Sequence, residues 1–204
     1  MSCAFIISAP SGTGKSTIVK RVLDEDPRLL FSISYTTRSP RGNEHPDVDY
    51  HYISRDEFED LIRKGDFLEH AQVFGNYYGT HRGVWEQAQA EGKDLVLDID
   101  VQGARQLRER IQDAVSVFIL APSRRELEHR LRTRSEDPAE VIRRRLSEAA
   151  REIRDYARYD YILVNRDVET SVAALKAIIG AERIRTGRMG GEIAPILNSF
   201  QSQE

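Results

Sequence analysis

The chain has 204 residues, of which 40% are hydrophobic and 31% charged, and its formal net charge at pH 7 is −3. This composition is typical of a soluble globular protein and excludes an extensively disordered chain. The small negative charge gives no electrostatic case for nucleic acid or an anionic membrane as a partner.

The chain has one cysteine, Cys3, which excludes an intrachain disulfide. The apolar run that begins there is too short for the hydrophobic segment of a signal peptide, and no basic segment precedes it. No stretch approaches 18 consecutive apolar residues, so we expect no membrane span. These features together predict a cytoplasmic protein.

The first predicted elements are a strand, a loop and a helix. A short apolar run at 5–7 leads into a glycine-rich turn, and an amphipathic segment follows at 16–23. This order indicates the start of an α/β fold. Later apolar runs resemble strands that are buried on both faces of a mostly parallel sheet, and helical patterns separate them. The strands are expected at 95–99, 115–120 and 161–164, and the helices at about 101–110, 124–134 and 138–156.

Three segments depart from this alternating pattern. Residues 34–80 are polar, rich in tyrosine and locally alternating, which predicts an inserted, partly antiparallel β subdomain with one helix at 55–64. Residues 123–156 are crowded with arginine. The tail from residue 187 is glycine-rich, with a modest apolar patch at 193–197.

A glycine-rich phosphate-binding motif follows the first predicted strand. Residues 9–16 read Ala-Pro-Ser-Gly-Thr-Gly-Lys-Ser, which is the pattern G-x-x-x-x-G-K-[ST] with alanine in place of the first glycine. Gly12 and Gly14 would let backbone amides approach phosphate oxygens, and the helix N-terminus that follows favours an anion. Lys15 would serve the β- and γ-phosphates, and Ser16 would offer a hydroxyl to Mg²⁺. This motif predicts a nucleoside triphosphate site.

Two further patterns point to phosphate chemistry. Asp98 lies at the end of the predicted strand at 95–99, where a carboxylate beside the loop would bind Mg²⁺ through water. Arg38 and Arg41 lie three residues apart in a predicted loop, and guanidinium groups suit phosphate oxygens. Taken alone, two solvated surface arginines explain the second pattern equally well.

Several motifs resemble the guanylate kinase family in order and spacing. They read Ser34-x-Thr36-Thr37-Arg38-x-Pro40-Arg41, Asp49-Tyr50, Phe67-Leu68-Glu69, Gly75-Asn76-Tyr77-Tyr78-Gly79-Thr80 and Leu97-Asp98-Ile99-Asp100-x-Gln102-Gly103. The resemblance runs from about residue 5 to about residue 185. It implies a P-loop nucleoside monophosphate kinase-like fold with three layers, and an enzyme that transfers the γ-phosphate of ATP to GMP.

The resemblance implies a complete site for GMP. Arg38, Arg41, Tyr50 and Tyr78 would hold the phosphate, since cationic forks and phenol donors suit a dianion. Glu69 would accept hydrogen bonds from guanine N1–H and the 2-amino group, and adenine has neither of these donors. The remaining guanine contacts would come from Ser34, Thr80 and Asp100.

The resemblance also implies an ATP site and a mobile lid. An arginine-rich helix usually has a solvated, salt-bridged face, but this family carries lid cations that close over the transferring phosphate. The implied catalytic residues are Lys15, Arg130, Arg134 and Arg145, and which other arginines are only structural stays open. The implied ATP site comprises Ser8, Ala9, Pro10, Ser11, Gly12, Thr13, Gly14, Lys15, Ser16, Thr17 and Asn165, and Ser16 and Asp98 would serve Mg²⁺.

The chain departs from the family pattern at two places. Asn165 resembles the adenine-side position, but Arg166 follows where the family usually has an acid. His45, Pro46 and Asp47 stand where the family commonly has a glycine-containing turn, and we expect only a local change of the loop there. The five histidines show no paired metal spacing, so no structural metal is expected.

These inferences predict one guanylate kinase-like domain over 1–186 and a tail over 187–204. Its core would be formed by about 1–33, 81–122 and 157–186, its GMP-binding insert by 34–80 and its lid by 123–156. The expected ligands are ATP with Mg²⁺ and GMP, and dGMP and a homo-oligomer stay open.

Two alternative functions stay open at this point. A kinase of the same fold that phosphorylates a ribose bisphosphate would not need Glu69 or the motif at 34–41. A guanylate kinase-like module that binds phosphopeptides would not need Lys15 or the glycines of its loop.

Overall fold

The core of the protein is a five-stranded parallel sheet, seen in a computed structural model that describes residues 2–73, 75–134 and 138–201. The strand order is β2-β7-β1-β8-β9, and the paired strands run parallel. The bounds are Ala4–Ser8 for β1, Leu29–Phe31 for β2, Asp94–Asp98 for β7, Val115–Leu120 for β8 and Tyr161–Val164 for β9. The predicted α/β class with a mostly parallel core sheet is confirmed.

Helices cover both faces of this sheet and give three layers. Because side chains alternate along a strand, Phe5 and Ile7 of β1 face one side and Ala4 and Ile6 the other. The first side packs against α1 (Lys15–Glu25) and α7 (Val168–Arg183), and the second against α3 (Gly83–Glu91) and α4 (Val101–Arg110). Burial on both faces explains why the strands are continuous apolar runs.

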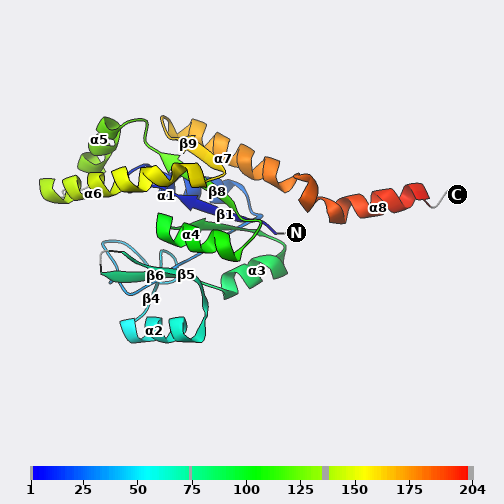
Figure 1. The fold of residues 1–204 in the computed structure, drawn as a ribbon, viewed down its shortest axis with the longest axis horizontal. Helices are drawn as coiled ribbons and strands as arrows, with labels where there is room; N and C mark the ends of the chain where they lie inside the picture. The colour runs from blue at the N-terminus through cyan, green and yellow to red at the C-terminus, as the bar shows by residue number, and fades with distance from the viewer. Residues whose placement is uncertain (1, 74, 135–137, 202–204) are drawn as a thin grey trace.

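A smaller second sheet lies below the core in Figure 1. Its strand order is β4-β3-β6-β5, antiparallel except for the short parallel pair of β3 and β4. The strands are β3 (Tyr35–Thr36), β4 (His51–Tyr52), β5 (Phe67–Val73) and β6 (Asn76–His81), and α2 spans Arg55–Lys64. Phe58 of α2 is completely buried and its ring stacks on Phe67 and Tyr77. A capping box at Ser54 and Glu57 begins this helix.

Two helices form an arm at the end of the molecule opposite α8 (Figure 1). They are α5 (Arg124–Arg134) and α6 (Ala139–Glu152), followed by the 3₁₀ helix η1 (Ile153–Arg158). They share a separate apolar cluster, with Leu127 and Leu131 on α5 and Ile142 and Leu146 on α6. One helix was expected over 138–156, but α6 ends at Glu152 and the 3₁₀ helix η1 follows it.

The C-terminal segment forms a helix that projects away from the body (Figure 1). After the 3₁₀ helix η2 (Thr186–Arg188), α8 spans Gly190–Gln201 and contains Pro195. Four exposed apolar side chains recur along it with helical spacing: Ile193, Ile196, Leu197 and Phe200. Within the described ranges, no helix combines the length and apolar character needed to cross a membrane.

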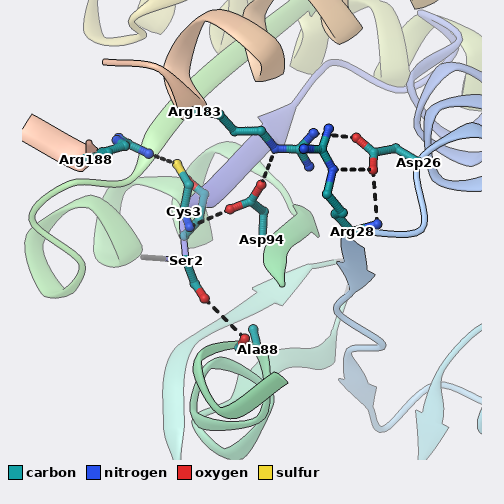
Figure 2. Close-up of polar contacts among 9 residues, drawn as sticks. Ser2, Cys3, Asp26, Arg28, Ala88, Asp94, Arg183 and Arg188 are labelled. Carbon is teal, nitrogen blue, oxygen red and sulfur yellow. Dashed lines mark hydrogen bonds and ion pairs between the residues drawn. The ribbon is translucent and has the colours of Figure 1, made fainter. Parts of the chain in front are cut away.

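A network of charged side chains joins the start of the core sheet to the end of α7 (Figure 2). Arg183 donates to Asp94 at 2.6 Å and to Asp26 at 2.5 Å, and Asp94 also accepts from the backbone N–H of Cys3 at 2.8 Å. Arg188 contacts the Cys3 thiol. Burial raises the pKa of that thiol to about 11, so Cys3 stays protonated and structural.

Candidate active site

A cleft of about 570 Å³ opens where the core sheet, the second sheet and α6 meet. The loop after β1, the end of β7 and the start of α4 form one side, and β5, β6 and α6 form the others. Its volume lies in the range of small-molecule sites. Its position at the carboxyl ends of parallel strands is where α/β sheets usually bind ligands.

The glycine-rich loop lines this cleft from Ala9 to Ser16. Gly14 has a φ of 96° and directly precedes α1, so the backbone turns sharply into the helix N-terminus. Lys15 pairs with Asp98, and its Nζ donates to the carbonyl of Ile99 at 3.3 Å. Ser16 Oγ donates to Asp98 at 3.3 Å. The loop thus places a cation, a hydroxyl and a carboxylate together at one end of the cleft.

Arg38 is held behind the cleft by a carboxylate that the sequence analysis missed. Glu44 accepts from both terminal nitrogens of Arg38, at 2.8 and 2.9 Å, and Arg38 Nε donates to the Tyr78 hydroxyl at 3.1 Å. The hydrogen bonds from Arg38 lower the pKa of Glu44 to about 2, so the pair stays ionised. The backbone N–H of Arg41 also donates to Glu44 at 2.8 Å. Glu44 therefore organises the arginine loop.

Two tyrosines complete this corner of the site. Tyr50 and Tyr78 line the cleft, with ring centroids 5.9 Å apart, and the Arg38 guanidinium lies 5.3 Å from the Tyr50 ring centroid. Burial raises the pKa of Tyr50 to about 12. Its hydroxyl therefore remains a hydrogen-bond donor near neutral pH. Arg41 also lines the cleft, so cationic and phenolic donors converge there.

Glu69 forms a buried acidic pocket between β5 and the start of α4. Its side chain is only 3% exposed, and Thr80 donates to it at 2.7 Å. Burial raises the pKa of Glu69 to about 7, with a smaller contribution in the same direction from Asp100. Asp100 caps α4 by accepting from the Gly103 N–H at 2.8 Å. A Cβ at Gly103 would lie 2.4 Å from Glu69 Oε2, so this approach requires glycine.

One face of α6 contributes further charged side chains. Arg145, Glu148 and Glu152 line the cleft at helical spacing, opposite the start of α4. Burial raises the pKa of Glu152 to about 7, and the nearby Asp100 carboxylate acts in the same direction. Glu148 and Glu152 were not predicted, because acidic residues in an arginine-rich helix resemble ordinary salt-bridge partners.

The structure brings most of the sequence-predicted residues to this cleft. Besides the loop, it is lined by Ser34, Arg41, Tyr50, Glu69, Tyr78, Asp98, Asp100 and Arg145. Other predicted residues lie around it. Ser8, Arg38, Thr80 and Asn165 are buried next to cleft residues, Thr17 is exposed on α1, and Arg130 bonds the backbone of the loop. The side chain of Arg134 lies outside the described part of the structure.

The oxygen donors near Lys15 fit a phosphate-bound Mg²⁺ better than a metal held by protein alone. Ser16 and Asp98 are hard oxygen donors that lie 3.3 Å apart. Across residues 2–73, 75–134 and 138–201, no group of three or more His, Cys, Asp or Glu side chains is arranged to hold a metal. Phosphates and water would therefore supply most ligands of such an ion.

Comparison with known proteins identifies close relatives over nearly the whole chain. The guanylate kinase family model matches residues 1–182. A guanylate kinase of Vibrio parahaemolyticus is 48% identical over 202 residues, covering 98% of this chain and 97% of the relative. One of Koribacter versatilis is 54% identical over 184 residues, covering 89% and 79%. The crystal structure of guanylate kinase from Anaplasma phagocytophilum is 34% identical with a TM-score of 0.77, covering 92% and 89%.

Proposed function

The chain belongs to the guanylate kinase family, and from this premise we propose that its cleft transfers the γ-phosphate of ATP to GMP, giving ADP and GDP. The observation that carries the proposal is that the glycine-rich loop and the Glu69 pocket open onto one cleft. A donor and an acceptor can therefore meet there without crossing bulk water.

The donor phosphates are assigned to the loop at 9–16. Its backbone amides and the N-terminus of α1 suit an anion, and Lys15 supplies a positive charge beside them. When bound, Mg²⁺ would neutralise phosphate charge, and Ser16 and Asp98 are the residues proposed to hold it through direct or water-mediated contacts. Ser8 and Thr17 flank the loop and would support its geometry.

The acceptor is assigned to the opposite part of the cleft. Arg38, Arg41, Tyr50 and Tyr78 would bind the GMP phosphate, because they bring cationic and phenolic donors together. Glu69 would read the guanine edge. Ionised Glu69 offers acceptors to N1–H and the 2-amino group, and adenine cannot satisfy both. Thr80 orients this carboxylate, and Ser34 and Asp100 would complete the contacts to the base.

The chemistry needs positioning and charge and no covalent intermediate. Two phosphates bound at opposite parts of one cleft can react in line, and cations stabilise the charge on the transferring group. Lys15 and Arg145 line the cleft and would supply this charge directly. Arg130 and Arg134 come from α5. Arg130 already bonds the backbone of the loop, and we propose that Arg134 joins it at the site when the lid closes and excludes water.

The domain assignments also stay proposals. We propose a core of about 1–33, 81–122 and 157–186, a GMP-binding insert over 34–80 and a lid over 123–156, with a tail after residue 186. The insert contains the second sheet and the lid contains the separate apolar cluster of α5 and α6. Cytoplasmic location stays a prediction, and the oligomeric state stays open.

A coupled assay of ADP release tests the function. The purified chain is supplied with ATP, Mg²⁺ and one acceptor at a time from GMP, dGMP, AMP, UMP and CMP. We expect turnover with GMP and at least about 10²-fold lower kcat/KM with AMP, because AMP leaves the Glu69 acceptors unpaired. A clear preference for AMP or a pyrimidine nucleotide would refute the proposed acceptor. The response to dGMP shows whether the ribose 2′-hydroxyl is read.

A further inference from the structure

The carbonyl oxygen of Thr13 ties the centre of the glycine-rich loop to the rest of the protein. It accepts hydrogen bonds from Asn165 Nδ2 at 2.7 Å and from Arg130 Nη1 at 3.2 Å. Thr13 and Asn165 are each 1% exposed, so water competes little for this contact. A backbone oxygen between two glycines with positive φ is thereby fixed in direction.

The direction of this oxygen determines the direction of the next backbone amide. The described residues contain no cis peptide bond, and a planar trans peptide points its C=O and N–H to opposite sides. With the Thr13 oxygen turned toward Asn165, the N–H of Gly14 faces away from Asn165. Gly14 lines the cleft, so this N–H is available there as a donor to phosphate.

The orientation of the Asn165 amide is supported in turn by Ser171 on α7. Ser171 Oγ donates to Asn165 Oδ1 at 2.9 Å, and Ser171 is only 3% exposed. Asn165 directly follows β9, and its backbone N–H donates to the carbonyl of Leu120 at 2.7 Å. This bond fixes Asn165 beside the end of β8. If the amide were reversed, Oδ1 would face the Thr13 carbonyl, and two acceptors would be opposed.

We propose that Ser171 is a positioning residue for ATP binding, acting through Asn165 and the Thr13 carbonyl to turn the Gly14 N–H toward the donor phosphates. This inference rests on the proposed role of the loop in binding ATP. Both ends of the Asn165 amide are engaged inside the protein, so its contribution runs through the loop backbone and not through adenine. The contact is close, because a Cβ at Gly14 would lie 2.4 Å from Asn165 Nδ2.

Steady-state kinetics of Ser171→Ala, with Thr170→Ala as a matched control, test the inference. The Thr170 hydroxyl also lies on α7, but it bonds Asp167 at the exposed start of the helix. We expect Ser171→Ala to raise the KM for ATP about fivefold or more, the size of one lost hydrogen bond. The KM for GMP should change less than about twofold, and Thr170→Ala should change neither. Equal increases for both substrates, or no increase for ATP, would overturn the inference.

A near-isosteric variant covers the case in which Ser171→Ala does not fold. Asn165→Asp replaces the Nδ2 donor with an oxygen that opposes the Thr13 carbonyl. It should raise the KM for ATP by more than Ser171→Ala, about 10-fold or more, again with little effect on GMP. An Asn165→Asp enzyme that binds ATP as the wild type does would contradict the inference.

The Gly14 amide signal in ¹⁵N–¹H NMR spectra gives a direct measurement with ADP alone. In the wild type, ADP should move this signal downfield, and in Ser171→Ala the shift at saturating ADP should be clearly smaller. An equal shift in both proteins, or a wild-type signal that does not respond to ADP, would refute the inference. Because no acceptor is present, a normal Gly14 response without GMP phosphorylation would refute only the proposed function.

Discussion

Thr80 donates its hydroxyl hydrogen to the Glu69 carboxylate across 2.7 Å, from the position directly opposite on the neighbouring strand β6. The two side chains are 0% and 3% exposed. A cross-strand pair of this kind keeps a carboxylate in one orientation at a buried position. The pocket is therefore shaped before a base enters it.

Glu69→Gln should damage recognition of GMP far more than of ATP. The side-chain NH₂ of the variant would face a donor of guanine. One buried hydrogen bond to the base would be lost, and two donors would be opposed. We expect kcat/KM for GMP to fall about 10²-fold and the KM for ATP to change less than about twofold. Glu59→Gln is the control, because Glu59 is a surface carboxylate paired with Arg55. Unchanged use of GMP would show that Glu69 does not read the base.

Activity toward GMP should fall as the pH drops below about 7. Burial raises the pKa of Glu69 to about 7, so at pH 6 the ligand-free pocket holds a neutral acid and at pH 8 a carboxylate. Only the carboxylate accepts from both guanine donors, so kcat/KM for GMP should decline with a limb near pH 7. Because the pKa of Glu152 is also raised to about 7, a Glu152→Gln enzyme must keep this limb. If kcat/KM for GMP no longer declined below pH 7 in that variant, the decline would be assigned to Glu152.

The raised pKa of Glu69 also predicts how stability depends on pH without ligand. A carboxyl group with a pKa raised from 4.5 to about 7 binds its proton more tightly in the folded state. Its contribution to the free energy of unfolding is present below about pH 4.5 and is lost as the pH rises through 7. Denaturant unfolding of the wild type and of Glu69→Gln between pH 5 and 8 measures this contribution. The advantage of the wild type in free energy of unfolding should narrow or reverse as the pH rises.

Glu44→Gln should weaken GMP binding although Glu44 is not assigned to the substrate. The variant loses the ionised partner that holds both terminal nitrogens of Arg38. Since hydrogen bonds to charged groups contribute about 1.5–3 kcal/mol, we expect kcat/KM for GMP to fall about 10-fold or more. Asp60→Asn on α2 is the control, because it removes only surface pairs, with Arg63 and Lys64. An unaffected Glu44→Gln enzyme would show that Arg38 does not need this partner.

Lys15→Met should abolish turnover while GMP binding survives. Lys15 is the cation nearest Asp98 at the loop, and GMP is assigned to the other part of the cleft. We expect kcat to fall at least about 10²-fold, since removing a charge-stabilising group in a shielded site has this effect. Calorimetric titration with GMP should still show binding. Full turnover in the variant would contradict the assignment of Lys15.

Arg183→Met should destabilise the fold and spare the chemistry. Arg183 bonds both Asp94 and Asp26 and is mostly buried. Its loss leaves the buried Asp94 carboxylate without its cationic partner, whereas Asp26 keeps Arg28. We expect about 3 kcal/mol less stability, measured by denaturant unfolding. Lys176→Met, which removes the exposed pair with Glu25, should leave the stability almost unchanged. Equal losses in the two variants would show that burial of the Arg183 network adds nothing.

The sequence indicated the core and the loop because their signals are local. The strands at β1, β7 and β8 are continuous apolar runs, and the glycines and Lys15 of the loop form a contiguous motif between strand and helix. The contribution of Glu44 could not be read in the same way. It depends on a loop that folds back on Arg38, and no local pattern specifies that contact.

The loop around Glu44 shows how a departure in sequence is accommodated. Only a local change was expected at His45, Pro46 and Asp47. Asp47 adopts a φ of 63°, and His51 contacts its carboxylate at 2.7 Å. Asp is among the residues that tolerate this left-handed conformation, so it can take the place of a glycine. Glu44 lies beside this turn and bonds Arg38.

The helix in the C-terminal tail could not be predicted, because its local sequence signals conflict. Glycines at its start and Pro195 within it obscure the helical spacing of Ile193, Ile196 and Leu197. Proline disfavours the interior of a helix, so local propensity argued against α8.

The network around Asp94 has a consequence for the order in which the chain can fold during synthesis. Asp94 sits between Cys3, at the start of the core sheet, and Arg183, which is synthesised after every described strand of that sheet. β9 and α7, which complete the sheet and cover it, also come from this late part of the chain. A nascent chain would thus carry a carboxylate without its cationic partner until α7 has been synthesised. Completion of the native core should therefore wait until the end of α7 has left the ribosome.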